Sequence, residues 1–354
     1  MLTPLFIAVA VAALGFLIVV HEGGHYFVAR WCQMRIERFS IGFGPGVIKK
    51  TSKTTGTTFQ IAPIPFGGFV EIRGMNIAED VDPEDQHAYP NRPVWQRFLT
   101  IFAGPATNYL SAIVLAMALY TCHGVEAPSR YYGVAKVMPD YDANGKLEAG
   151  DRITKVNGAD LFVNQGPSLN ERINESKGAP IKLTVLRDGQ PREVQITPRR
   201  DKDAGGKQVW RIGVAYDREE VVSVGVVEAA QGALIYPVEQ TKVIGKALYG
   251  IVFGSEKADP GGPIRMVEEF YNAFSAGVVP GIKLLMMLSV YLGLFNLLPI
   301  PALDGGRLVF LIYEMVTRRR ANPKIETMVH MAGIMALGVV MLVVLYIDIR
   351  RFWT

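Results

Sequence analysis

Val-Val-His-Glu-Gly-Gly-His at residues 19–25 lies within an apolar run that begins near Pro4. On a helix, His21 and His25 are four residues apart and lie on one face. Two neutral imidazoles in this arrangement can bind one Zn²⁺, with Glu22 beside the metal as a general base. Ionisable groups inside an apolar helix are costly in a bilayer, so the pattern predicts an intramembrane functional site rather than a chance match.

The composition is typical of a membrane protein with a water-soluble part. Of the 354 residues, 49% are hydrophobic and 20% are charged. The net charge of +4 is modest and predicts no nucleic-acid partner. Cys32 and Cys122 fit neither a disulfide framework nor a zinc site. The N-terminal run lacks the basic segment and cleavage site of a signal peptide, so we expect a retained span.

Apolar stretches long enough to cross a bilayer, which takes about 20 residues, occur at 4–28, 97–121, 278–300 and 326–347. Lys and Arg cluster after the first stretch and between the third and fourth, and the positive-inside rule assigns both clusters to the cytoplasm. Both chain ends and the long segment between the second and third spans are then expected outside. Arg350 and Arg351 at the outer end fit this rule poorly.

Residues 59–72, between the first two expected spans, alternate in polarity and have Pro and Gly at their centre. The pattern predicts a membrane-associated β-hairpin that dips into the bilayer against the helices. A surface hairpin is equally compatible. An exposed edge there could add a substrate strand, which makes Gly67 and Gly68 candidate substrate-binding residues. The nearby glycines within 42–46 do not indicate a dinucleotide site, because no βαβ unit follows them.

The second expected span carries Gly-Pro-Ala-Thr-Asn at residues 104–108. Small residues permit close helix packing, and Asn108 can form a hydrogen bond across a helix interface. We expect a structural role for this stretch.

Residues 128–218 have the character of a soluble β-rich domain. Residues 146–158, Lys-Leu-Glu-Ala-Gly-Asp-Arg-Ile-Thr-Lys-Val-Asn-Gly, resemble the L-x-x-G-D-x-I-x-x-V-N-G signature of PDZ domains, which bind extended peptides by strand addition. One copy is visible. Residues 225–275 favour amphipathic helices on the outer leaflet over a linker folded against this domain. The expected parts of the chain are 1–121, 122–220, 221–277 and 278–354.

A catalytic zinc site needs a third protein ligand and a position left for water. Glu37 lies in a basic loop and Glu71 on an expected strand, and neither suits the role. Asp304 follows the third span, after two prolines that break the helix. The first span reaches His21 after about 26 Å of helix, so both segments arrive near the cytoplasmic side of a core about 30 Å thick. Asp304 is therefore the expected ligand, rather than a helix-end residue at the membrane surface.

These motifs resemble those of bacterial site-2 proteases, of the regulator of sigma-E protease type. Residues 21–25 match H-E-x-G-H, and residues 296–306 match N-x-x-P-x-P-x-L-D-G-G. With one PDZ-like insert between the second and third spans, the likeness covers nearly the whole chain. The best-known Gram-negative members carry two tandem PDZ domains and this sequence shows one, so the signalling pathway does not follow from the resemblance.

The resemblance implies a multi-span α-helical membrane protein of the bacterial inner membrane, with four transmembrane helices, a membrane-associated β-hairpin and one PDZ-like β-rich domain. It implies Zn²⁺ held by His21, His25 and Asp304, with Glu22 as the base, toward the cytoplasmic side. The implied substrates are transmembrane segments of single-span membrane proteins already cut by another protease, such as anti-sigma factors or signal peptide remnants.

Asn296 is a candidate for binding the oxyanion or the substrate backbone, and Pro299 for contacting substrate. A capping or interhelical role for the Asn296 amide is equally compatible. Gly23 and Gly24 each cost about 1 kcal/mol relative to alanine in a helix. Their presence indicates a close approach by substrate or by another segment of the chain.

Two other classes of function stay open. The protein could be an inactive homologue that binds membrane proteins through its PDZ-like domain, although the intact Glu22 and all three expected ligands argue against this. It could instead be a transporter that uses the polar intramembrane cluster, although no sequence repeat is detectable.

Overall fold

The computed structural model describes residues 4–76, 79–126, 131–161, 168–202, 208–216, 221–254 and 261–353. The chain forms two compact units. The first, here called the membrane unit, comprises Met1–Tyr120 and Val226–Thr354. The second, the PDZ-like unit, comprises Thr121–Gly225.

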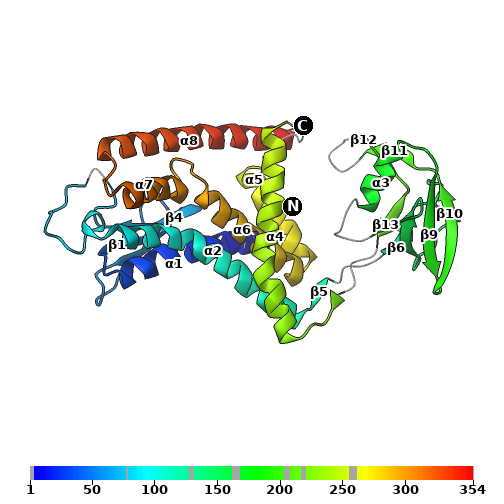
Figure 1. The fold of residues 1–354 in the computed structure, drawn as a ribbon, viewed down its shortest axis with the longest axis horizontal. Coiled ribbons are helices and arrows are strands. Elements are labelled where there is room, and N and C mark those ends of the chain that lie inside the picture. Colours follow the sequence, from blue (N-terminus) through cyan, green and yellow to red (C-terminus); the bar gives the residue numbers. More distant parts are fainter. Residues whose placement is uncertain are drawn as a thin grey trace. The chain divides into compact units, whose positions relative to one another are not determined.

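Helices long and apolar enough to cross a bilayer dominate the membrane unit (Figure 1). They are α1 (Pro4–Trp31), α2 (Val94–Cys122), α6 (Val278–Leu297) and α8 (Pro323–Trp353). The prediction of four candidate spans is confirmed for the described residues. In α8 only 6% of the most apolar window is buried within the protein, so most of its surface is available to lipid.

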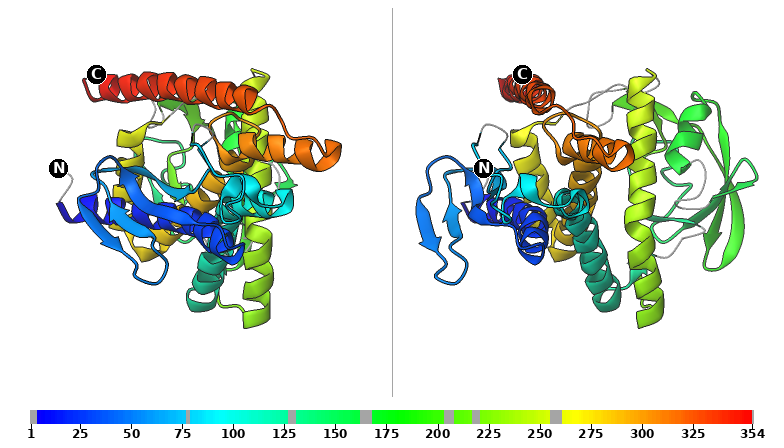
Figure 2. Two further views of the ribbon diagram at one scale, coloured as in Figure 1. Left: turned by 90° about the vertical axis from the view of Figure 1, so that its left-hand side faces the viewer. Right: turned by 60° about the vertical axis from the view of Figure 1, so that its left-hand side comes forward.

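Shorter or more polar helices complete the membrane unit. They are the 3₁₀ turn η1 (Tyr89–Asn91), α4 (Val226–Val252), α5 (Pro263–Ala276) and α7 (Asp304–Thr317). Phe270 of α5 is buried with Ala13 and Leu17 of α1, which ties the two helices together. In both views of Figure 2, α4 runs steeply across the direction of α8. The expected helices within 225–275 are present, and their location on a membrane surface stays a prediction.

A four-stranded sheet packs against α1 in the order β2-β3-β1-β4. Its strands are β1 (Ile36–Phe43), β2 (Ile48–Thr51), β3 (Thr58–Ile61) and β4 (Ile64–Ile72). β1 is parallel to β3 and antiparallel to β4, and β2 is antiparallel to β3. The side chain of Tyr26 on α1 contacts Phe39 and Phe59, so aromatic packing joins the helix to one face of the sheet.

The predicted hairpin over residues 59–72 is wrong in its pairing. β3 and β4 do not pair with each other, because β1 lies between them. The chain passes from β3 to β4 across the end of β1 at Gly42, where φ is +89° and a Cβ would lie 2.6 Å from the carbonyl oxygen of Ala62. Only glycine suits this crossing. The basic stretch interpreted as a loop therefore supplies the central strand that the hairpin prediction lacked.

The PDZ-like unit is built on a sheet in the order β10-β9-β7-β6-β13, with β8 paired to β7. Its larger strands and helix are β6 (Tyr132–Val137), β7 (Arg152–Val156), β9 (Ile181–Arg187), β10 (Gln190–Ile196), β13 (Val214–Tyr216) and α3 (Leu169–Glu175). The shorter strands are β5 (Val125–Glu126), β8 (Ala159–Asp160), β11 (Arg199–Lys202), β12 (Gln208–Arg211) and β14 (Val221–Val222).

Residues of the PDZ-like signature have clear structural roles. Ile153 and Val156 of β7 belong to the buried core, and Gly158 forms the turn after β7 with φ +78°. Asp151 is buried and accepts two hydrogen bonds of 2.7 Å from the Arg187 guanidinium. Although burial favours the neutral carboxyl, hydrogen bonding to Arg187 holds the pKa of Asp151 below its usual value.

Candidate metal centre

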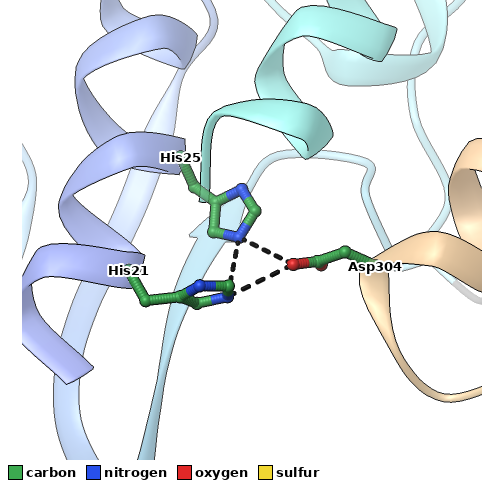
Figure 3. A group of neighbouring side chains, drawn as sticks. All are labelled: His21, His25 and Asp304. Atoms are coloured by element: carbon green, nitrogen blue, oxygen red, sulfur yellow. Dashed lines mark hydrogen bonds and ion pairs between the residues drawn. The ribbon is translucent and has the colours of Figure 1, made fainter. Parts of the chain in front are cut away.

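Three side chains from two distant parts of the sequence converge at one point (Figure 3). His21 and His25 lie one turn apart on α1, and Asp304 is the first residue of α7. Asp304 Oδ2 lies 3.2 Å from His21 Nε2 and 3.3 Å from His25 Nε2. The two Nε2 atoms are 3.3 Å apart. We call these atoms the ligand triangle.

The ligand triangle fits a Zn²⁺ ion in both distance and chemistry. His25 Nδ1 donates to a carbonyl oxygen, so in the neutral imidazole Nε2 carries a free lone pair. Asp304 Oδ2 is buried and has no hydrogen-bond partner within the described residues. Ligand atoms of a tetrahedral zinc with bonds of about 2.0–2.1 Å stand about 3.3 Å apart. The observed separations of 3.2–3.3 Å match this spacing.

Close packing of α1 against α2 orients His25. Its Nδ1 donates a hydrogen bond of 2.8 Å to the backbone oxygen of Thr100 on α2. The ring lies directly over Gly104, where a Cβ would stand 2.2 Å from Nε2. A side chain at position 104 would therefore displace the imidazole from the ligand triangle.

The two glycines between the histidines differ in what surrounds them. A Cβ on Gly24 would lie 2.3 Å from the backbone oxygen of Ala103, so this position needs glycine for the helix crossing. A Cβ on Gly23 would meet nothing closer than the ring of Phe27, at 3.8 Å. The sequence predicts close approach by either substrate or another segment of the chain. For Gly24, that approaching segment is α2.

The loop between α6 and α7 brings Asp304 to the histidines through tight backbone contacts. A Cβ on Gly305 would lie 2.0 Å from the carbonyl oxygen of Leu298. A Cβ on Gly306 would lie 2.6 Å from that of Ile300. The Gly-Gly pair after the aspartate therefore lets the chain fold back on itself and start α7 beside α1.

Glu22 lies next to the ligand triangle without belonging to it. Its carboxylate lies near the backbone N–H of Val70 on β4. A Cβ on Gly68 would lie 3.1 Å from Cγ of Glu22, so the strand passes close to this side chain. Glu22 thus lies between the candidate metal position and the edge of the sheet.

The edge of β4 that faces Glu22 has open backbone groups. The backbone carbonyl of Ile41 on β1 accepts a hydrogen bond from the backbone N–H of Ala62, so it points toward β3 and away from β4. Because Ile41 is opposite Gly68, Gly68 directs its N–H and C=O away from β1. Val70, two residues further, has the same orientation, and its backbone N–H lies near Glu22. Within the described residues no strand pairs with this edge.

The other predicted site residues lie around this centre. Asn296 is half-buried in the last turn of α6, and its side chain has no hydrogen-bond partner among the described residues. Pro299 is exposed in the loop that follows. Gly67 is on β4, where a Cβ would collide with the ring of Phe43.

The two acids set aside as zinc ligands have other partners. Glu37 pairs with Arg73 at 3.4 Å, and Glu71 pairs with Arg38 at 3.1 Å. Neither carboxylate belongs to the ligand triangle.

Asn108 has a contact that the sequence interpretation did not foresee. Its side-chain amide lies 2.9 Å from Nδ1 of His21. The signal in the sequence is a spacing of four: Thr100, Gly104 and Asn108 lie on one face of α2. This face is turned toward the two histidines of α1.

The sequence profile of Peptidase family M50 matches residues 9–341, so the chain belongs to that family. A protein of Rickettsia conorii named "Putative zinc metalloprotease" is 30% identical over 97% of this chain and 98% of its own length. A protein of the same description from Mesorhizobium japonicum is 33% identical over 90% of this chain and 91% of its own. The protein is accordingly a zinc metalloprotease with several membrane-spanning helices.

Among solved structures, the PDZ domain of an SdrC-like protein from Listeria innocua is similar to part of this chain. It is 25% identical, it covers 26% of this chain and 99% of its own, and the TM-score is 0.22.

Proposed function

We propose that this protein is an intramembrane endopeptidase in which His21, His25 and Asp304 hold the zinc ion and Glu22 is the general base. The ligand triangle carries this proposal, because its spacing and its free lone pairs suit a metal ion. Two of the three residues are on a candidate span. A bound zinc makes water nucleophilic near neutral pH and polarises the substrate carbonyl.

Glu22 has a suitable position for proton transfer. It is adjacent to the ligand triangle, and its side chain lies against β4, close to Gly68 and to the backbone N–H of Val70. From there it can accept the proton of the attacking water and later pass it to the leaving amine. The amide of Asn296, which is without a partner among the described residues, is available to stabilise the oxyanion or the substrate backbone.

The substrate that suits this site is a membrane-embedded peptide in extended form. The open edge at Gly68 and Val70 offers N–H and C=O groups for strand addition next to Glu22. A transmembrane helix satisfies its own backbone groups, so the segment to be cut must unwind before it can pair with this edge. Gly67 and the exposed Pro299 are further candidate contacts.

We place the enzyme in the bacterial inner membrane, with the basic segments and the zinc site toward the cytoplasm and both termini outside. The PDZ-like unit is then outside as well. It would act as a filter that admits single-span substrates already shortened by another protease, such as anti-sigma factors or signal peptide remnants. The intact Glu22 beside a complete ligand triangle favours this function over that of an inactive peptide-binding homologue.

The decisive experiment replaces Glu22 by glutamine in the purified full chain. Zinc content should stay stoichiometric, whereas cleavage of a transmembrane substrate should fall by at least about 10²-fold. Glu37→Gln makes the same chemical change outside the site and should leave both measurements unchanged. Loss of zinc from Glu22→Gln, or turnover near that of the parent, would show that the assigned role is wrong.

A further inference from the structure

We propose that Asn108 is a positioning residue for zinc: its amide oxygen accepts a hydrogen bond from Nδ1–H of His21 and so leaves Nε2 of that ring free for the metal. The inference rests on the proposed function, in which His21 is a zinc ligand. It assigns to α2 a direct part in building the metal centre.

The first observation is the position of the Asn108 amide. The residue is completely buried, and its side chain crosses from α2 to α1, where Nδ2 as assigned lies 2.9 Å from Nδ1 of His21. The amide oxygen is also buried and has no hydrogen-bond partner within the described part of the chain. No hydrogen bond from the described residues therefore holds the amide oxygen in its assigned orientation.

The second observation concerns the proton on His21. An imidazole that binds a metal through Nε2 carries its proton on Nδ1. An amide NH₂ group 2.9 Å from that Nδ1 would then set two donors against each other. Because the oxygen and nitrogen of an amide have nearly the same shape, their assignment depends on the hydrogen-bond network. With zinc bound, the Asn108 oxygen must therefore face His21.

The third observation is a parallel at the other histidine. His25 donates from Nδ1 to the backbone oxygen of Thr100, also on α2. Asn108 lies eight residues further along the same helix, and therefore on nearly the same face. Both imidazoles are thus contacted at Nδ1 by α2, while both Nε2 atoms point into the ligand triangle. Zinc-binding histidines commonly donate their second ring N–H to such an acceptor, which fixes the tautomer and the ring orientation.

A purely structural role for Asn108, as a hydrogen bond between two helices, predicts a different result. If the role is only structural, replacing Asn108 should lower the stability of the metal-free protein. The zinc affinity of the folded protein should then be unchanged. The two roles are separated by measuring the zinc dissociation constant and the thermal stability of the metal-free protein on the same samples.

The experiment compares Asn108→Asp, which can only accept when ionised, with Asn108→Leu, which has a similar shape and no hydrogen bond. Ser289→Ala is the matched control, because Ser289 is buried and accepts an interhelical hydrogen bond of 3.0 Å from α2 without contact to either histidine. The full chain is reconstituted in lipid nanodiscs, and zinc is titrated against a competing chelator.

Asn108→Leu should weaken zinc binding by about 10- to 100-fold, and Asn108→Asp should stay within about threefold of the parent. Ser289→Ala should lower stability without changing zinc affinity. Parental zinc affinity in Asn108→Leu, or a loss in Asn108→Asp as large as in Asn108→Leu, would overturn the inference. If the leucine variant does not fold, Asn108→Ala replaces it. If neither folds, Asn108→Asp decides alone: retained zinc supports an acceptor, and lost zinc overturns it. A parent that binds no zinc would instead overturn the proposed function.

Discussion

Replacing Gly24 by alanine tests whether the crossing of α1 and α2 sets the geometry of the metal centre. The new Cβ would lie 2.3 Å from the Ala103 oxygen and 2.5 Å from Thr107 Oγ1, whereas ordinary contacts begin at 3.4 Å. The helices must therefore separate by about 1 Å, because packed interiors hold no spare volume. An equal shift would lengthen the bond from His25 to Thr100 from 2.8 Å to about 3.8 Å, too long for a hydrogen bond.

A displacement of about 1 Å in an active site can cost about 10²-fold in rate. We therefore expect Gly24→Ala to lower kcat/KM by about 10²-fold. Gly15→Ala on the same helix is the matched control, since a Cβ there would meet nothing within 4 Å and alanine favours the helix by about 1 kcal/mol. The assay is cleavage of a transmembrane substrate by the full chain in nanodiscs, with thermal unfolding measured in parallel. Activity of Gly24→Ala within about threefold of the parent would refute the reasoning.

Three further predictions follow from the proposed assignments and from the PDZ-like unit. In competition with a chelator, Asp304→Asn should bind zinc at least about 10-fold more weakly than the parent. Glu71→Gln should bind zinc as the parent does. Equal zinc retention by both variants would place the third ligand elsewhere. Removal of residues 128–218 should permit cleavage of full-length substrate while trimmed substrate stays cleavable, at matched expression; equal slowing of both would favour recruitment over filtering. Because its bonds to Arg187 lower the pKa of Asp151 in the folded state, that carboxylate stabilises the protein above its usual titration range, and the effect is lost as pH falls below about 4. Asp151→Asn should therefore reduce the free energy of unfolding by about 1–3 kcal/mol at pH 7 and by progressively less toward pH 3, measured by denaturant titration.

The sequence was sufficient to predict the spans and the convergence of three side chains. The length of an apolar helix sets whether it can cross a bilayer, so candidate spans follow from composition alone. The four-residue spacing of His21 and His25 places them on one helix face. Asp304 follows the prolines that end the third span, at an expected membrane depth close to that of the histidines. The structure brings these three together, while their role as ligands stays a prediction.

The pairing of the sheet could not be read from alternation. Alternation shows that a stretch is a strand and says nothing about the strand beside it, so the pattern of residues 59–72 predicts a simple hairpin. The strand between β3 and β4 is β1, whose charged residues indicate a cytoplasmic loop by the positive-inside rule. The crossing over Gly42 depends on the absence of a Cβ, and a glycine in sequence does not state which segment approaches it.

The contact between Asn108 and His21 was missed for a related reason. A polar residue in an apolar helix predicts a partner on another helix, and the helix face that meets it depends on tertiary packing. Only the arrangement of α1 against α2 shows that the partner is a histidine of the ligand triangle.

The order in which the chain is made has a consequence for the cell that makes it. In the proposed ligand set, Asp304 lies 279 positions after His25, the nearer histidine. At about 5–20 residues per second, a ribosome needs roughly 15–55 s to cover that distance. During this time the nascent chain contains both imidazoles without the carboxylate of the proposed ligand set. On the proposed assignment, the protease can become active only after Asp304 has been synthesised, so neighbouring membrane proteins would meet no active site before that point.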